Sequence, residues 1–225
     1  MPPAGSGRHV FVNGGQGLEN SGEPGTYETG WGATDWNNTT DIDPTNGALA
    51  HPPYSTWTNT AGSHENLLIN YLNWYEAYAF CIWDGGFLPT ETEWEYAAAG
   101  GSQQREYPWG SAGPGTTNQY AIYYCDQDPG GCVGTTNIAP VGTATLGAAR
   151  WGQLDMAGEV SEWNVDWYAM YAACSDCAYL TTAVYRVVRG GSFLGAASYL
   201  LRAGRDSISP TLAGIGIGFR CARTP

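Results

Sequence analysis

The sequence predicts one turn-rich domain with two short helices and a few strands. Glycine supplies 32 of the 225 residues and aromatic side chains supply 13%, a composition typical of large rings packed between many turns. Hydrophobic residues make up 43%, enough to bury a core at this length. The chain has no visible internal repeat or linker, and its composition argues against a helix bundle rich in Ala, Leu, Glu and Lys.

The chain is strongly acidic. All nine basic residues are Arg, and 21 Asp and Glu residues bring the net charge to −12. A negative surface repels phosphate, so nucleic-acid partners and anionic membranes are not expected, whereas cations such as Ca²⁺ are attracted. Acidity that serves only solubility is the alternative. Because no run of 18 apolar residues occurs, no membrane span is predicted.

Residues 1–65 are rich in Gly, Asn, Thr and Pro and predict an irregular N-terminal part, with residues 66–225 forming the rest of one compact domain. Aromatic side chains are expected to anchor the N-terminal part: Tyr27, Trp31, Trp36, Tyr54 and Trp57.

Two helices follow from local signals. Apolar residues at helical spacing predict the first over 73–83, with Asp84 and two glycines ending it; its apolar face comprises Trp74, Ala77, Tyr78, Cys81 and Ile82. Thr90 and Glu93 form a capping box that predicts the start of the second, which ends at Gly100. Its inner face is expected to carry Trp94, Ala97 and Ala98, and helix capping accounts for Glu91, Glu93 and Glu95.

The chain has six cysteines, and no histidine lies at zinc-finger spacing from any pair. The segment between Cys125 and Cys132 suits a disulfide-closed turn or an acidic Ca²⁺ loop. Cys174 and Cys177 favour a small disulfide over a redox thiol pair. Disulfides favour an oxidising compartment, so a secreted, periplasmic or cell-surface protein is expected, although residues 1–5 lack the apolar core of a signal peptide.

The last stretch, residues 186–223, predicts a strand at Val187 and Val188, a tight turn or close backbone approach at Gly190 and Gly191, and a second strand over 215–221. The loop between two strands is a place where a rigid scaffold presents function. Arg189 and Arg220 flank the strands and are expected to form structural ion pairs.

Six ordered motifs give the chain a family resemblance. They are WYEAYAFCIWDGGFLPTETEWEYAAAGG from Trp74, YPWG at 107–110, APVG at 139–142, LDMAGEVSEW at 154–163, RVVRGGSF at 186–193 and GFRCAR at 218–223. Together they resemble the formylglycine-generating enzyme, or sulfatase-modifying factor, family over residues 66–223. The resemblance implies an α+β domain of C-type-lectin-like topology with low regular secondary structure and long loops.

The resemblance also implies binding sites. A calcium site would use the side chains of Asp155 and Glu162 and the carbonyls of Gly158 and Val160, because hard oxygen ligands suit Ca²⁺. Glu159 replaces the customary Asn, a position not expected to be a ligand. A looser second calcium site would draw on Asn118 with Asp126 or Asp128. The family disulfide implies Cys81–Cys221, which leaves Cys125–Cys132 and Cys174–Cys177.

One departure from the family matters for function. The oxidases carry a pair of copper-binding cysteines after the GGS segment, and the matching positions here are Gly195 and Leu200. The intervening His position is Ala196. Cu(I) needs soft thiolate ligands, so copper is not expected. Non-haem iron is not expected either, because His9, His51 and His64 lie outside the segment that carries the resemblance.

The sequence therefore favours a non-catalytic, calcium-binding module that recognises an unidentified protein, peptide or glycan. An enzyme with altered chemistry on a peptide or protein, and a structural subunit of a cell-surface assembly, are the alternatives. The expected ligand surface comprises Ser192, Phe193, Leu194, Gly195, Ala196, Ser198, Tyr199, Leu200, Arg202, Asp206 and Ser207.

Overall fold

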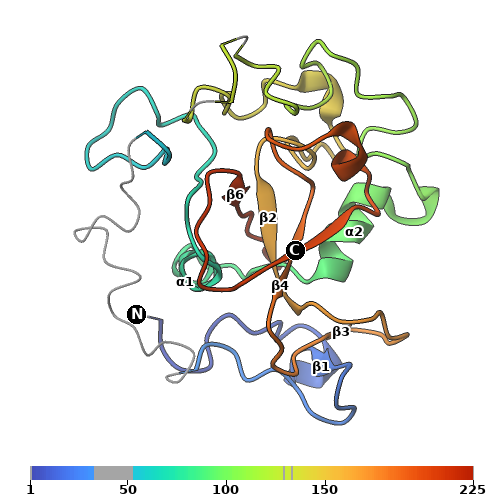
Figure 1. Cartoon of the computed structure of the whole chain (residues 1–225). Helices are drawn as coiled ribbons and strands as arrows, with labels where there is room; N and C mark the ends of the chain where they lie inside the picture. Colours follow the sequence, from blue (N-terminus) through green and yellow to red (C-terminus); the bar gives the residue numbers. More distant parts are fainter. Residues whose placement is uncertain (1, 33–52, 129, 133, 225) are drawn as a thin grey trace.

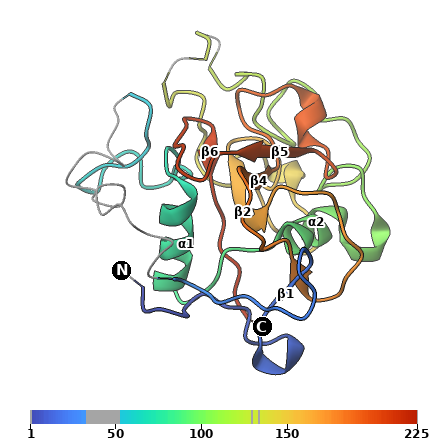
Figure 2. The same cartoon turned by 60° about the horizontal axis from the view of Figure 1, so that its bottom comes forward.

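The computed structural model describes residues 2–32, 53–128, 130–132 and 134–224. Regular secondary structure is sparse and long loops dominate, as expected for the α+β fold. Two helices, α1 (Trp74–Trp83) and α2 (Glu91–Ala99), lie on opposite sides of the central strand β2 (Ser161–Trp167) in both views (Figures 1 and 2).

The main sheet has four strands in the order β5-β4-β2-β6. Strand β4 (Arg186–Arg189) runs antiparallel to both β2 and β5 (Arg205–Ile208), whereas β6 (Ile217–Gly218) runs parallel to β2. The predicted strand over 215–221 is therefore shorter than expected. Strand β2 is buried along almost its whole length, so it lacks the alternation that reveals a strand in sequence.

A second, two-stranded sheet joins distant parts of the chain. Strand β1 (Glu19–Asn20) pairs in parallel with β3 (Cys177–Ala178), at the lower end of the molecule in Figure 1. Short 3₁₀ turns lie at Asn13–Gly15, Gly101–Gln103, Thr145–Gly147 and Ala197–Leu200, which are η1, η3, η4 and η5.

Both helices begin where their capping signals predict. The Thr90 side chain accepts from the Glu93 amide at 3.0 Å, and Glu93 accepts from the Thr90 amide at 2.8 Å. Asn73 and Glu76 form the same reciprocal cap on α1. Gly100 ends α2 in the left-handed conformation. Local sequence thus fixes where each helix starts.

The core lies between α1 and the sheet. Trp74, Ala77, Tyr78 and Cys81 of α1 are buried there, as predicted, against Trp163 of β2 and neighbouring strand residues. A second cluster packs Trp94 and Ala98 of α2 against Met156. Burial on both sides fixes the sheet, and with it the loop that follows β4.

The N-terminal aromatic residues fulfil only part of their predicted role. Trp31 is buried against Tyr78, with ring centroids 5.7 Å apart, and Tyr27 is half-buried. Tyr54 and Trp57 are exposed, so their burial does not support the prediction that they anchor the N-terminal part; Tyr54 stacks on Tyr71. Trp36 and His51 lie outside the described residues.

Candidate functional site

The loop after β4 surrounds a cavity of about 150 Å³. It begins with Gly190 and Gly191, both with positive φ; a side chain at Gly190 would meet the Met156 carbonyl oxygen at 2.8 Å. The predicted close backbone approach is therefore present. The cavity brings together five of the predicted surface residues: Ser192, Leu194, Gly195, Tyr199 and Asp206.

Two of the predicted surface residues point inward. Phe193 is 0% exposed and packs with Ile122, Ile138 and Ala139, and Leu200 is 1% exposed and packs in a second cluster. Their assignment to the ligand surface is therefore wrong, because apolar side chains of this size gain more from burial than from exposure to water. These two buried side chains fix the loop to the core, and other side chains of the loop face the solvent.

The remaining predicted surface residues lie around the cavity without lining it. Ala196 and Ser198 are exposed on the loop that carries η5, and Ser207 is half-buried in β5. Arg202 donates to Glu95 at 2.7 Å. Its guanidinium is thus already paired, which limits its use in ligand binding.

An ion-pair network supports the loop from below. Arg189, 1% exposed, donates to Glu95 and to the Arg202 carbonyl, and its guanidinium lies 5.1 Å from the Trp94 ring centroid. Arg205 of β5 binds Glu91 through two hydrogen bonds of 2.6 and 2.7 Å. The structural pairing predicted for Arg189 is confirmed.

The sequence interpretation of Glu91 and Glu95 as helix-capping residues was incomplete. Each joins α2 to arginines more than 90 residues away along the chain. Their spacing in α2 could have indicated a shared interaction, because residues four apart lie on one helix face. The arginine partners could not be identified from spacing.

The first calcium motif forms a buried turn that leads into β2. Asp155 accepts from the Gly142 amide at 2.7 Å through one oxygen, while its other oxygen is buried and without a hydrogen-bond partner. Burial raises the pKa of Asp155. An unpartnered buried carboxylate oxygen fits a cation ligand.

Glu162 is differently placed. Its two oxygens accept from Arg220, each at 2.6 Å, and one also accepts from the Trp94 indole at 2.6 Å. The structural pairing predicted for Arg220 is thus confirmed, and a Ca²⁺ ion at this motif would share Glu162 with the guanidinium. Burial raises the pKa of the neighbouring Glu159 to about 9, which keeps it neutral at pH 7.

The second calcium candidate is more open. Asn118 donates to the Asp126 carbonyl at 3.2 Å, and its own side-chain oxygen is buried without a partner. Asp128 accepts from the Gly130 amide, and this bond lowers its pKa. Within the described residues no three His, Cys, Asp or Glu side chains form a metal-sized group, so either site would depend on carbonyl oxygens.

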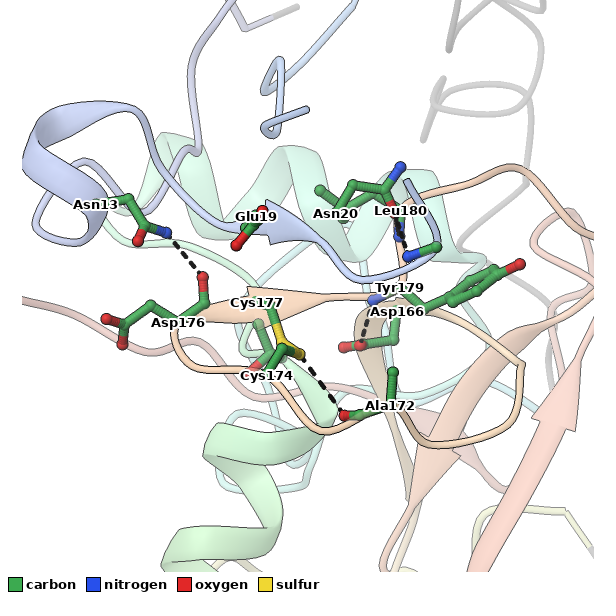
Figure 3. The surroundings of a disulfide bond; sticks show 12 residues. Asn13, Glu19, Asn20, Asp166, Ala172, Cys174, Asp176, Cys177, Tyr179 and Leu180 are labelled. Atoms are coloured by element: carbon green, nitrogen blue, oxygen red, sulfur yellow. Dashed lines mark hydrogen bonds between the residues drawn. A yellow bond between two sulfur atoms is a disulfide. The ribbon is translucent and has the colours of Figure 1, made fainter. Parts of the chain in front are cut away.

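All six cysteines are in disulfides: Cys81–Cys221, Cys125–Cys132 and Cys174–Cys177. These are the pairs expected for the chain. The first connects α1 to the C-terminal segment, and the third closes a loop beside β3, drawn in Figure 3. No free cysteine remains.

The sequence analysis did not identify the structural role of the buried residue His9. His9 lies between the carboxylates of Glu28, at 3.1 Å, and Glu93, at 3.3 Å. Burial alone would lower the pKa of His9, but hydrogen bonds and charge from these carboxylates raise it to about 9. His9 is therefore a cation that holds the N-terminal segment to α2.

Comparisons with solved structures place the fold among known ones. The chain superposes on Treponema denticola variable protein 1 with a TM-score of 0.55 at 23% identity, covering 79% of each chain. It superposes on PvdO from Pseudomonas aeruginosa with a TM-score of 0.57 at 22% identity, covering 72% of this chain and 63% of that one. At such identities these likenesses show the fold alone.

Sequence comparisons show the family. The chain is 36% identical over 169 residues to the formylglycine-generating enzyme of Thermomonospora curvata (69% of this chain, 55% of the relative) and 31% identical over 183 residues to that of Mus musculus (75% and 49%). It is also 35% identical over 158 residues to inactive C-alpha-formylglycine-generating enzyme 2 of Bos taurus (68% and 48%). The chain spans about half the length of these relatives.

The family model "Sulfatase-modifying factor enzyme 1-like domain" matches residues 25–225. The sequence motifs had suggested that the family resemblance begins at residue 66, but the match begins at residue 25. It therefore includes His51 and His64. It also covers the sheet, both helices and the loop with its cavity. This chain therefore belongs to the sulfatase-modifying factor enzyme 1-like domain family.

Proposed function

We propose that this chain is a non-catalytic, calcium-stabilised binding module of its family, with a protein or peptide segment as ligand. The observation that carries this proposal is the loop after β4, where the family resemblance places Gly195 and Leu200 at the positions of the oxidases' cysteine pair. Leu200 is buried among apolar side chains, and the six cysteines are all in disulfides. Cu(I) would find no thiolate ligand there.

Overall similarity does not decide between enzyme and binding module. Relatives described as formylglycine-generating enzymes and relatives described as inactive match this chain at comparable identity. The individual residues at the two cysteine positions must therefore decide, and they support the non-catalytic alternative.

The cavity suits recognition of an extended segment. Leu194 and Tyr199 are exposed at its edge, and Ser192 and Asp206 add polar groups. A cavity of about 150 Å³ accommodates one side chain rather than a whole small molecule. The surrounding polar groups could bind the peptide backbone while the cavity selects the side chain.

Copper loading tests the non-catalytic part. Native protein and the double variant Gly195→Cys/Leu200→Cys are incubated with Cu(I) and a cysteine-containing peptide, and bound copper and oxygen uptake are measured. A Cβ atom at Gly195 would meet its nearest neighbours at 3.4 Å or more, which is ordinary van der Waals contact. We expect copper to bind the variant only; oxygen uptake by the native protein would show that it is an enzyme.

Peptide selection tests the binding surface. A displayed random peptide library is panned against the native protein, and selected peptides are titrated against Leu194→Asp and Tyr199→Ala. Val184→Asp, at an exposed position outside the cavity, is the matched control. We expect at least a tenfold loss of affinity in the first two variants only. Equal binding by all three variants would place the ligand elsewhere.

Calcium is tested by removal. Asp155 offers a free buried oxygen, and a ligand that binds only the native state stabilises it by about 3 kcal/mol at one hundred times its Kd. EDTA should lower the melting temperature of the native protein, and Ca²⁺ should restore it. Asp155→Asn should reduce that response, whereas Asp176→Asn, an exposed control, should keep it. A melting temperature indifferent to both EDTA and Ca²⁺ would refute the calcium site.

The three disulfides support a location in an oxidising compartment, which we propose to be the periplasm, the cell surface or the extracellular space. Among the described residues, none of the helices has the length and apolar character needed to span a bilayer.

A further inference from the structure

A second cavity, of about 500 Å³, lies at the N-terminal end of α2. Its walls come from the N-terminal segment, the first turn of α2, the loop between β2 and β3, and the C-terminal residues. Cavities of 300–1,000 Å³ are typical of small-molecule sites. It is distinct from the cavity of the loop after β4, with which it shares Arg205.

The wall formed by residues 169–179 is held in place at several points. The Cys174–Cys177 disulfide closes it, and β3 pairs with β1. The Tyr179 amide donates to Asp166 at 3.0 Å, drawn in Figure 3, and Arg205 donates to the Ala169 carbonyl at 2.7 Å. The cavity is therefore preformed, which reduces the cost of ordering on binding.

Much of the lining is apolar or aromatic. Phe11, Phe87, Tyr96 and Tyr171 contribute rings, and Met170, 91% exposed, lies at the edge. Ring faces and a polarizable thioether favour an apolar ligand body, and ring faces also attract cations.

The charges around the cavity are unbalanced. Arg205 is neutralised by Glu91, and Arg223 pairs with Asp84. One imidazolium, His9, serves both Glu28 and Glu93. Asp166 and Asp176 add two further carboxyl groups. Arg186 lies close enough to lower the pKa of Asp166, and with it included the sum of these charges is still negative, so a positive ligand is favoured.

Asp166 is the most deeply placed of these acids. It is buried, and both of its oxygens accept from backbone amides, those of Glu91 at 2.7 Å and Tyr179 at 3.0 Å. Burial nevertheless raises its pKa to about 6, against the lowering effect of these two hydrogen bonds and of the nearby Arg186 guanidinium.

We propose that this cavity binds an organic cation, an apolar body that carries a protonated amine, with the amine directed toward Asp166 and Glu93. The source can be a free amine or a lysine side chain of a partner, since both present the same alkylammonium group. This site is separate from the proposed peptide surface and does not depend on it.

Titration calorimetry tests this proposal with three probes of matched shape: 4-phenylbutylamine, 4-phenylbutanol and 4-phenylbutyrate. We expect the amine to bind at least tenfold more tightly than the other two. A peptide with an acetylated N-terminus and a free lysine side chain identifies the source. If this peptide binds and the free amine does not, the site belongs to a protein side chain. Absence of binding by both cationic probes, or equal binding of amine and alcohol, would overturn the proposal.

Variants locate the binding. Thr92→Trp fills the cavity from α2, and Thr117→Trp places the same side chain on an exposed loop as a control. Asp166→Asn removes the deepest charge. We expect loss of amine binding in the first, no change in the control, and at least a fivefold weakening in the third, with melting curves confirming that all are folded. Tyr199→Ala, in the other cavity, should bind the amine normally; retained binding in Thr92→Trp would refute the location.

Discussion

The N-terminal segment, residues 2–32, and the four-stranded sheet are attached to the fold by different forces. The sheet is enclosed by apolar packing, with Trp163 and Val188 almost inaccessible to solvent, and its buried residues Arg189 and Glu162 form ion pairs. The segment has fewer apolar contacts, made by Leu18, Trp31, Val12 and Phe11, and it adds polar ones, among them the His9 imidazolium and the side chains of Asn13 and Asn20. The comparison predicts that burial governs the stability of the sheet and that pH governs the attachment of the segment.

The largest loss of unfolding free energy is expected on removal of the disulfide Cys81–Cys221, which closes the part of the chain that contains the sheet strands. Cys81 and Cys221 are 140 residues apart, whereas Cys174 and Cys177 are three apart. Because a longer loop loses more entropy when closed in the unfolded chain, Cys81→Ala/Cys221→Ala should cost about 4 kcal/mol of unfolding free energy, and Cys174→Ala/Cys177→Ala about 2 kcal/mol. Urea denaturation measures both. Equal losses would show that loop length does not decide the difference.

The second-largest effect concerns the buried carboxylate of Glu162 in β2. Glu162 is 2% exposed, so Arg220→Ala leaves it without its cation and should cost about 3 kcal/mol. Arg223→Ala breaks an exposed pair with Asp84 and should cost under about 1 kcal/mol, as a matched control. If both variants lost the same amount, burial would not be the cause.

The third prediction addresses the segment through pH. The pKa of His9 is raised from 6.5 to about 9, so its contribution is fully present below pH 6.5 and is lost as the pH rises through 9. The unfolding free energy of the native protein should fall by on the order of 3 kcal/mol between these values, relative to His9→Gln. Parallel pH profiles for the two proteins would contradict the assignment.

The smallest effect is expected at one polar contact of the segment. The Asn13 amide donates to the Gly17 carbonyl at 2.8 Å and to the Asp176 carbonyl at 2.9 Å, the second of which is drawn in Figure 3. Asn13→Ala should cost about 1 kcal/mol. Hydrogen exchange should accelerate at the Glu19 amide, which bonds to the Asp176 carbonyl, and stay unchanged at Val165 in β2. Faster exchange at both amides would show that segment and sheet open together.

The sequence predicted those features that depend on neighbouring residues. Thr90 and Glu93 specify the start of α2 because the cap is complete within four residues, and Gly190 and Gly191 mark a turn for the same reason. The pairing of Glu91 with Arg205, 114 residues away, has no local signal. The two-residue strands β1 and β3 are too short to produce an alternating pattern.

The loop that carries the candidate site was predicted in position but not in detail, and its role as a ligand surface stays a prediction. The family motif located the loop after β4, and the cavity confirms that five of its predicted residues come together. Phe193 and Leu200 were included because the whole loop was assigned to the ligand surface, whereas apolar loop residues can turn into the core. The 500 Å³ cavity could not be predicted, since its walls come from four separate parts of the chain.

Arg205 gives the two cavities a common wall. Its guanidinium is bound to Glu91 and lies 4.3 Å from the Tyr171 ring centroid, while its backbone begins β5 directly after the loop that follows β4. A ligand that displaces this side chain from one cavity alters the shape of the other. By thermodynamic reciprocity, whatever factor an amine applies to the affinity for a peptide, the peptide must apply to the affinity for the amine.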